Sequence, residues 1–505
     1  MNRSKQLSAL TNTSQWDIVI IGGGATGAGA ALDAASRGYK TLLIEQYDFA
    51  KGTSSKSTKL VHGGVRYLQQ GNIKLVLEAL RERGRLLKNA PHLTSNQAFI
   101  VPVFSTWEKI FYAIGLKMYG LLAGKLSLGK TSILNKQQVV ELLPSIKQDK
   151  LVGGIQYYDG QFDDSNLCIE ILGTAVKHGA TVINYCKAIG FEKEAKKING
   201  VKIADTITNQ EYNIKAKAVI NATGAFTNQV MEMDDKAHHD FVTASQGIHF
   251  IINKEFFKGT TAMMIPKTDD GRVLFAVPWQ DKVIVGTTDT PINEAKIEPL
   301  PLAEEIEFIL NHINRYGTET ITRANINSVY VGLRPLIKVK SKAKTSALSR
   351  DHAIHISDAR LITITGGKWT TYRKMASDAV NNATFIGKLK QQKCITENLQ
   401  INLTDQKQEV INNLIKQDAT LSEKIHPNYT YTKAEIIYAV NNQMAFNVED
   451  VLARRIRLLF LDARVAMQVA PLVASVMAST LNKNQDWAEQ QISSFNALAS
   501  NYILS

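Results

Sequence analysis

Cysteine, proline and long apolar runs are all scarce in this chain. It has 3 Cys and 11 Pro among 505 residues, and Cys168, Cys186 and Cys394 form no CxxC pair. Neither a disulfide framework nor a metal-ligand pattern is indicated, so we expect each cysteine to be a small buried residue in a reducing compartment. The N-terminus lacks an apolar stretch that could form the core of a signal peptide. We therefore expect a cytoplasmic protein.

Low-complexity tracts and internal repeats are also missing. Hydrophobic residues make up 44% of the chain and are spread along its whole length, which is typical of a globular protein with two or three domains. We expect disorder only in the first dozen residues.

The positive charge is concentrated in one stretch. Of the net charge of +13, residues 71–136 contribute ten Lys or Arg against three acids, a local excess of +7. Such an excess attracts an anionic partner. No nucleic-acid-binding motif is present, so the sequence favours an acidic membrane surface or a phosphorylated substrate and excludes nucleic acid.

Residues 17–45 read as one strand-helix-strand unit with a dinucleotide-binding turn. The turn contains the G-x-G-x-x-G glycines Gly22, Gly24 and Gly27, and the second strand, 41–44, is followed by Glu45. Glycines there allow a sharp turn, close approach of a pyrophosphate and tight helix packing, while the helix N-terminus faces the phosphates. Glu45 is positioned to accept the ribose hydroxyls and would repel a 2′-phosphate.

A second dinucleotide fingerprint is not present elsewhere in the chain. The strand 218–221, followed by Thr223 and Gly224, is typical of the strand that returns to the same cofactor in flavoproteins. Without a second nucleotide site there is no evident NAD(P) to exchange electrons with a flavin. The sequence therefore predicts another electron acceptor.

The run Gly52–Leu68, GTSSKSTKLVHGGVRYL, closely resembles the FAD-dependent glycerol-3-phosphate dehydrogenases. The similarity continues as far as residue 373 in six further motifs, which are DGRV at 270–273, VPW at 277–279, GTTDT at 286–290, GLRPL at 332–336, SRDH at 349–352 and TGGKWTTYR at 365–373. It covers nearly the whole chain from Trp16.

This resemblance implies an α/β fold. An FAD-binding two-dinucleotide-fold (Rossmann-like) domain would be interleaved with an antiparallel-sheet substrate domain over residues 1–385, followed by a helical C-terminal domain over 386–505. The sequence pattern agrees in part, because Thr432 begins a capping box, and Asn447 and Pro471 mark further expected helix starts. The polar stretch 398–424 reads as the connection into that domain.

The resemblance also implies where the cofactor, FAD, is held. We expect the contacts to come from the glycine turn, the hydroxyl-rich run and the later strand ends, namely Gly22, Gly24, Gly27, Glu45, Thr53, Ser54, Ser57, His62, Gly63, Gly64, Ala188, Thr223, Gly224, Gly367, Lys368 and Thr370.

The substrate implied by the family is sn-glycerol 3-phosphate, oxidised by hydride transfer to the flavin. Arginine forks suit a phosphate, so we expect Arg334 and Arg350 to bind it with Arg66 and Tyr67 beside them. The alternative for each arginine is an ion pair that only stabilises the fold. Lys368, next to glycines, is expected to act at the flavin and the substrate oxygen.

The general base is less well determined by the sequence. His62 precedes two glycines and has a side chain suited to accepting a proton near neutral pH. His249 is the second candidate, and a purely structural histidine is an alternative for either. At Gln246 the family usually carries Lys or Arg, so this chain lacks one cation there, which affects the details of substrate contact.

Three other functions stay open at this stage. The chain could be an amino-acid or amine oxidoreductase of the same superfamily, an oxidase that passes electrons to oxygen, or a flavin-bound sensor or scaffold. With neither a second nucleotide site nor a metal motif, we favour a membrane quinone as the acceptor.

The segment 107–128 is the expected membrane contact. At 100° per residue the apolar side chains gather within about 120° of one another, namely Ile110, Phe111, Ile114, Met118, Leu121 and Leu122. Trp107, Tyr112, Tyr119 and the surrounding lysines suit an anionic headgroup region. Lys117 interrupts it too much for a spanning helix. A helix packed on the protein's own core is the alternative. We expect a peripheral protein on the inner face of the cytoplasmic membrane; the sequence leaves open whether it forms a homodimer.

Overall fold

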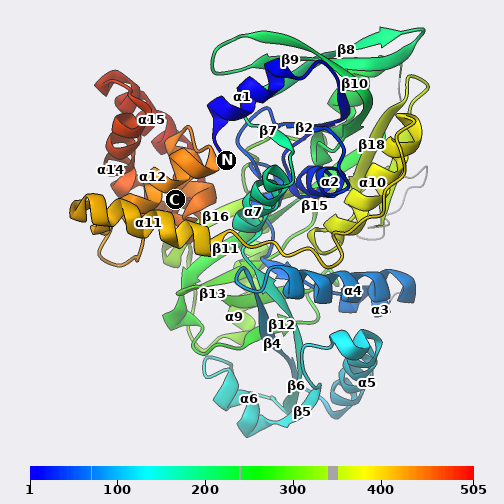
Figure 1. Ribbon diagram of the computed structural model, residues 1–505. Coiled ribbons are helices and arrows are strands. Elements are labelled where there is room, and N and C mark those ends of the chain that lie inside the picture. Colours follow the sequence, from blue (N-terminus) through cyan, green and yellow to red (C-terminus); the bar gives the residue numbers. More distant parts are fainter. Residues whose placement is uncertain (70, 238–239, 339–350, 505) are drawn as a thin grey trace.

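The structure is a computed structural model that describes residues 1–69, 71–237, 240–338 and 351–504. Two sheets and a group of C-terminal helices make up the molecule (Figure 1). Each sheet takes strands from separate stretches of the chain, so the chain passes repeatedly between the two. The interleaved α/β fold expected from the sequence is confirmed.

The first sheet has the strand order β17-β18-β10-β1-β2-β7. Its strands from β18 to β7 are parallel, and β17 joins the edge antiparallel. Parallel strands covered on both faces are apolar throughout, which explains the run WDIVII in β1. The bounds are β1 (Trp16–Ile21), β2 (Thr41–Ile44), β7 (Thr181–Ile183), β10 (Glu211–Asn221), β17 (His352–Ile356) and β18 (Leu361–Gly366).

Helices cover one face of this sheet and a β-meander covers the other. The helical layer holds α2 (Ala25–Ser36), α7 (Asp164–Lys177) and α10 (Tyr372–Ile386). Small residues in α2 allow close packing, since a Cβ at Gly29 would lie 2.8 Å from the Tyr372 ring. The opposite face packs against β8 (Cys186–Glu194), β9 (Lys197–Asp205) and α8 (Thr227–Asp234).

The expectation of a disordered N-terminus is wrong. Residues 3–12 form α1 (Arg3–Asn12), capped by the Asn2 side chain. Arg3 pairs with the buried carboxylate of Asp205 at 3.0 Å and donates to the Asn184 carbonyl, and Leu10 enters the core. One ion pair and one apolar anchor, both formed with residues far along the chain, hold the segment in place.

The second sheet has the strand order β15-β11-β14-β13-β12-β4-β6-β3, with β16 beside β11 and β5 beside β6. Its pairs are antiparallel except β12 with β4. The bounds are β3 (Leu60–Val61), β4 (Thr94–Val103), β5 (Ser132–Asn135), β6 (Gly153–Phe162), β11 (Val242–Asn253), β12 (Ala262–Ile265), β13 (Leu274–Trp279), β14 (Lys282–Gly286), β15 (Thr290–Ile292) and β16 (Ile326–Ile337). The helix α9 (Ala303–Tyr316) and α6 (Lys136–Leu142) pack into its core.

Three helices, α3 (Val65–Gln69), α4 (Ile73–Asn89) and α5 (Thr106–Ala123), pack together against β4 and β6 (Figure 1). The outer side of α5 is strongly exposed, at Trp107, Ile110, Phe111, Ile114, Met118 and Leu121. The expectation that Tyr119 faces a membrane is wrong, because Tyr119 is 2% exposed. Leu122 is also partly buried in the protein's own core, so the exposed face is narrower than periodicity indicated.

The C-terminal helices lie to one side of both sheets (Figure 1). They are α11 (Thr404–Gln417), α12 (Lys433–Gln443), the π-helical η9 (Asp450–Arg455), α13 (Leu458–Leu461), α14 (Ala463–Leu481) and α15 (Gln485–Ala499). The capping box at Thr432 is confirmed. Pro471 does not begin a helix but lies inside α14, which Asp462 caps. The stretch 398–424 is not a plain connection, because α11 forms within it. The domain boundary near 385 stays a prediction.

By length and composition α14 could cross a membrane. Its buried residues, however, form the core of the C-terminal helices together with α12 and α15. We therefore describe α14 as a core helix.

Candidate FAD and substrate site

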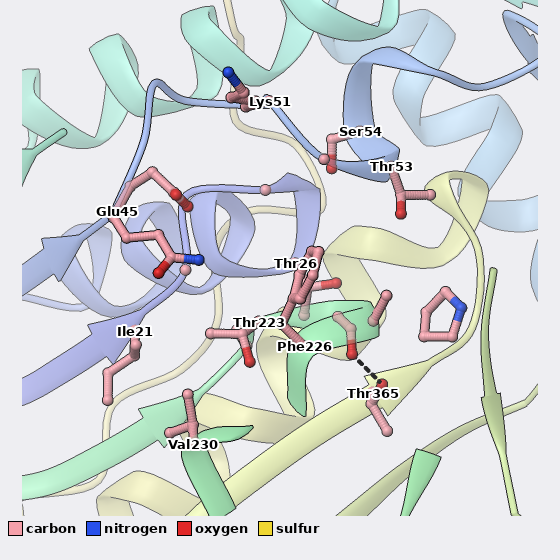
Figure 2. Close-up of a pocket in the computed structure, with 18 of the residues that line it drawn as sticks. Ile21, Thr26, Glu45, Lys51, Thr53, Ser54, Thr223, Phe226, Val230 and Thr365 are labelled. Atoms are coloured by element: carbon pink, nitrogen blue, oxygen red, sulfur yellow. Dashed lines mark hydrogen bonds between the residues drawn. The ribbon is translucent and has the colours of Figure 1, made fainter. Parts of the chain in front are cut away.

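A cavity of about 580 Å³ opens where the first sheet meets the N-terminus of α2. It contains most of the residues expected at the cofactor, namely Gly22, Gly24, Glu45, Thr53, Ser54, Ala188, Thr223, Gly224, Gly367 and Lys368. Figure 2 shows Glu45 at one side of it and Thr53 at the other, with Thr26 between them. The cavity lies at the carboxyl ends of β1, β2 and β18, where open α/β sheets bind ligands.

The glycine turn between β1 and α2 leaves room for a ligand against the backbone. Gly22 has a φ of 114°, and a Cβ there would lie 2.7 Å from the Ala222 carbonyl oxygen. A Cβ at Gly27 would overlap the Gly22 carbonyl, so Gly27 serves helix packing. Gly24 is the N-cap residue and has no side chain of its own to cap α2, while the Ser54 hydroxyl accepts from the first helical N–H, that of Ala25. The positive end of the helix dipole faces the cavity, as a pyrophosphate requires.

Glu45 is held at the end of β2 by two backbone N–H groups. Gly23 donates to Oε2 at 2.6 Å and Tyr47 donates to Oε1 at 2.9 Å. Burial raises the pKa of Glu45 above its usual value, against the lowering effect of these hydrogen bonds. A carboxylate that is fixed in this way, and still lines the cavity, has the chemistry to accept ribose hydroxyls.

These features fit FAD. The cavity has the volume of a large ligand site, a helix N-terminus in its lining for phosphate and a fixed carboxylate for ribose. At the far side, Gly366 and Gly367 have φ values of 80° and 65°, and their backbone gives a flat group close access. Ser54 closes the turn, because its Oγ accepts from the Ala25 N–H at 2.9 Å.

A second, smaller cavity of about 190 Å³ adjoins the first. Its lining includes His62, Gly64, Tyr67, Arg272 and Arg334. Lys368 lies between the two cavities, since it lines the first and its Nζ lies 3.8 Å from the centroid of the Tyr67 ring, which lines the second. A small substrate in the second cavity would therefore lie beside the end of the cofactor cavity.

Two arginines supply positive charge to the second cavity. Arg334, on β16, donates to the Thr287 hydroxyl at 3.1 Å and lies 3.5 Å from the Asp289 carboxylate, with 20% of its side chain exposed. Arg272 pairs with Asp270, and its guanidinium stacks 4.8 Å from the Phe308 ring. The sequence motif contained Arg272, but nothing in its pattern distinguished it as a cavity residue.

The two candidate bases have different surroundings. His62 lines the second cavity, and Thr370 holds its backbone through bonds to its N–H and carbonyl. His249 is 3% exposed, does not line either cavity, stacks on Tyr330 and shares a 2.8 Å hydrogen bond with the Thr58 hydroxyl. Burial, with the charges of Arg334 and Lys59, lowers the pKa of His249 well below its usual value. His249 therefore orients Thr58, which does line the second cavity.

Several other expected residues support the site from outside the first cavity. Ser57 faces away from it and donates to the Asp164 carboxylate at 2.7 Å. Gly63 donates to the Tyr119 hydroxyl. Gln246 lies outside both linings and donates to the buried Glu305 at 2.7 Å. Arg350 and the side chain of Arg66 lie outside the described residues.

Asp159, on β6, is a cavity residue that sequence reasoning missed. It is 3% exposed and lines the second cavity, and burial raises its pKa despite the neighbouring Arg83. A lone aspartate in a strand carries no pattern that would reveal this role. Within the described residues, no group of three or more His, Cys, Asp and Glu side chains could hold a metal ion.

Comparisons with known proteins agree with this geometry. Residues 17–373 match the family described as FAD dependent oxidoreductase, and residues 358–491 match the C-terminal domain of alpha-glycerophosphate oxidase. The chain is 38% identical to the mitochondrial glycerol-3-phosphate dehydrogenase of Homo sapiens, over 97% of this chain and 74% of that protein. A relative from Arabidopsis thaliana with the same activity in its name is 34% identical, over 97% and 87%.

Solved structures extend the similarity to three dimensions. The glycerol-3-phosphate dehydrogenase from Bacillus halodurans, complexed with FAD, has a TM-score of 0.77 at 27% identity and covers 99% of this chain and 97% of its own. The L-alpha-glycerophosphate oxidase of Mycoplasma pneumoniae, at 16% identity and a TM-score of 0.58 over 77% of this chain and 98% of its own, shares the fold. FAD is thus the cofactor, and the chain belongs to the FAD-dependent glycerol-3-phosphate dehydrogenase family.

Proposed function

We propose that this protein oxidises sn-glycerol 3-phosphate to dihydroxyacetone phosphate and passes the electrons to a membrane quinone. One observation carries the substrate assignment: a small cavity lined by two arginines joins the cofactor cavity at Lys368. The names of the relatives support the same substrate. When bound, FAD supplies the acceptor for the hydride.

Arg334 and Arg272 bind the substrate phosphate in this proposal. A guanidinium fork matches phosphate oxygens and keeps its charge at every accessible pH. The cavity of about 190 Å³ suits a three-carbon phosphate rather than a larger molecule. Binding of the remote phosphate can then be used to orient the reacting carbon.

His62 accepts the hydroxyl proton while the hydrogen on the same carbon leaves as hydride. Imidazole is the side chain that most often accepts a proton in catalysis, and His62 lines the cavity whereas His249 does not. Lys368 lies at the junction, where its ammonium orients the substrate oxygen and stabilises the negative charge that develops on it. Tyr67 holds that ammonium over its ring face.

The outer face of α5 is the proposed membrane contact. Ile110, Phe111, Ile114, Met118 and Leu121 are each 44% to 81% exposed, and Trp107 is 74% exposed. The surrounding stretch 71–136 carries the local charge excess of +7, which favours an anionic leaflet. A peripheral position on the inner face of the cytoplasmic membrane would bring the flavin close to quinone.

Anaerobic titration of the yellow holoenzyme tests the substrate. Addition of sn-glycerol 3-phosphate should bleach the flavin absorbance, with dihydroxyacetone phosphate formed in equal amount, whereas glycine and L-proline should leave it unchanged. Bleaching by an amino acid and not by glycerol 3-phosphate would overturn the substrate assignment.

Reoxidation of the bleached enzyme tests the acceptor. A soluble ubiquinone analogue should restore the absorbance much faster than air-saturated buffer at the same concentration of acceptor. Faster reoxidation by oxygen would identify an oxidase instead and would leave the substrate assignment intact.

A further inference from the structure

The turn His62–Gly63–Gly64 lies at the second cavity and passes beside Lys368, which lines the first. His62 and Gly64 line the second cavity. A Cβ at Gly64 would lie 3.1 Å from the Lys368 Nζ, so the backbone of the turn passes directly beside that ammonium. A shift of this turn would therefore move the proposed base and change the surroundings of Lys368 together.

Tyr119 of α5 holds the centre of this turn. Its hydroxyl accepts from the Gly63 N–H at 2.7 Å. A Cβ at Gly63 would lie 2.7 Å from the same hydroxyl oxygen and 2.6 Å from Leu80, so the fit between α5 and the turn requires glycine. The Tyr119 ring is 2% exposed and packs edge-on against Tyr157, which leaves the hydroxyl little freedom to move.

The hydroxyl is itself fixed from the other side by a buried charge pair. Tyr119 lies 2.9 Å from both carboxylate oxygens of Asp159 and donates to that group. Arg83 of α4, which is 1% exposed, donates to Asp159 at 2.6 Å. The chain of hydrogen bonds thus runs from Arg83 through Asp159 and Tyr119 to Gly63, and buried networks of this kind rigidify the groups at their ends.

We propose that the Tyr119 hydroxyl is a positioning group for the oxidation, which fixes the His62–Gly63–Gly64 turn against Lys368 and so aligns the proton acceptor with the substrate. The inference rests on the proposed function of the second cavity. It also gives α5 two roles, because the helix that presents the exposed apolar face holds the active-site turn with its buried side.

Replacement of the hydroxyl alone tests the role. In Tyr119→Phe the ring remains but Gly63 loses its acceptor, so the rate constant for anaerobic flavin reduction at saturating sn-glycerol 3-phosphate should fall about 10- to 100-fold, as small misplacements of reacting groups do. The substrate concentration for half-maximal rate should change by less than about threefold, because the phosphate contacts persist. Tyr112→Phe removes a hydroxyl of the same helix that lies near Glu108 rather than at Gly63; it is the matched control and should match the wild type.

Rates are expressed per bound flavin, so that loss of cofactor or partial unfolding does not count as an effect on the reaction. A wild-type reduction rate in flavin-loaded Tyr119→Phe would overturn the proposal. If the wild-type holoenzyme is not reduced by sn-glycerol 3-phosphate, the proposed function itself fails, which is a different outcome.

Hydrogen–deuterium exchange on the wild-type holoenzyme keeps the proposal testable if the variant does not fold. The Gly63 amide, read at single-residue resolution, should be strongly protected, and it should exchange at least about tenfold faster in folded Tyr119→Phe than in Tyr112→Phe, since protection reports the hydrogen bond. Rapid exchange of Gly63 in the wild type would show that the turn is not held, and would overturn the proposal.

Discussion

Single side chains set the chemistry at the two ends of the joined cavities. Glu45 places a fixed carboxylate in the first cavity, and Arg334 places a guanidinium in the second. Both are held by neighbours of known geometry, Glu45 by two N–H groups and Arg334 by Thr287 and Asp289. Substitution of either one should therefore act locally.

Glu45→Gln should weaken FAD retention without unfolding the protein. The amide keeps one acceptor oxygen but turns an NH₂ group toward a backbone N–H. It also loses the charged acceptor, and a hydrogen bond to a charged group contributes about 1.5 to 3 kcal/mol. Flavin content after extensive dialysis measures the effect. Asp17→Asn, near the start of β1, where the carboxylate pairs with Lys217 and lies outside the cavity lining, is the matched control. Equal flavin content in all three proteins would show that Glu45 does not bind the cofactor.

Arg334→Ala should reduce kcat/KM for sn-glycerol 3-phosphate far more than for free glycerol. Loss of a charged hydrogen-bond partner costs about 2 to 5 kcal/mol, and only the phosphorylated substrate offers that partner. Steady-state kinetics with a soluble dye measure both substrates, with Arg323→Ala, an exposed arginine beside Glu307, as control. If both substrates lose activity equally, Arg334 is structural.

The sequence predicts some of these residues and not others for a physical reason. Glu45 and the glycine turn follow from a local pattern, because strand, turn and helix are adjacent in the chain. Asp159 and Arg272 reach the second cavity only through the pairing of distant strands. In the hydroxyl-rich run, the Ser54 side chain bonds the Ala25 N–H beside the cavity, whereas the Ser57 side chain bonds Asp164. Residue type alone cannot tell which serine lines the cavity.

Among the elements, α5 connects the exposed surface to the turn at the second cavity, through the hydrogen bond between Tyr119 and Gly63. Its apolar periodicity was evident in the sequence, but periodicity cannot tell a core face from an outer face. The structure separates them, since Ile114 is 64% exposed and Tyr119 is 2% exposed. In α14, too, the apolar pattern does not by itself say which face is buried. The pattern continues through Pro471, which lies inside the helix.

Ile114→Asp combined with Leu121→Asp should abolish pelleting with anionic vesicles at low salt. Two carboxylates on the apolar face add a desolvation cost and repel acidic lipid. Activity with a soluble dye should be retained, while quinone reduction in vesicles should be lost. Phe385→Asp, which changes a side chain that is 77% exposed on α10, is the control.

Vesicle binding by that double variant equal to wild type would place the membrane contact elsewhere. The side chains of Ile114 and Leu121 are exposed, so their substitution leaves the core intact. Leu122 is partly buried, and its substitution would disturb the protein's own core.

At the scale of the whole molecule, buried ion pairs join the C-terminal helices to the cofactor domain. Asp48, three positions after Glu45, pairs with Arg454 at 2.5 Å and with Arg455 at 2.7 Å. Arg457 donates to Asp164 at 2.9 Å. The partners are about 400 and 300 positions apart in the chain, so no local sequence pattern could predict them, and the interleaved fold itself was predictable only through the family resemblance.

Acid should weaken this junction. Burial alone would raise the pKa of Asp48. The charges of Arg455 and Arg454 outweigh burial and lower this pKa to about 2 from a usual value of 3.8. A carboxyl group with a lowered pKa in the folded state stabilises the fold above its unfolded pKa, and this contribution is lost as the pH falls through the folded pKa. The free energy of unfolding should therefore drop between about pH 4 and pH 2.

Asp48→Asn isolates that contribution. The variant should be about 3 to 5 kcal/mol less stable near neutral pH, because two arginines lose their buried partner, and its stability should depend less on pH between 4 and 2. Chemical denaturation at several pH values measures both. Parallel pH dependence in variant and wild type would mean that Asp48 does not contribute.

A crystal structure of the holoenzyme with dihydroxyacetone phosphate tests most directly whether the two joined cavities are the cofactor and substrate sites. We expect the phosphate between Arg334 and Arg272 in the second cavity and the carbonyl end toward Lys368 and His62, with FAD filling the first cavity. A ligand bound at another surface, or with its phosphate away from both arginines, would contradict the account.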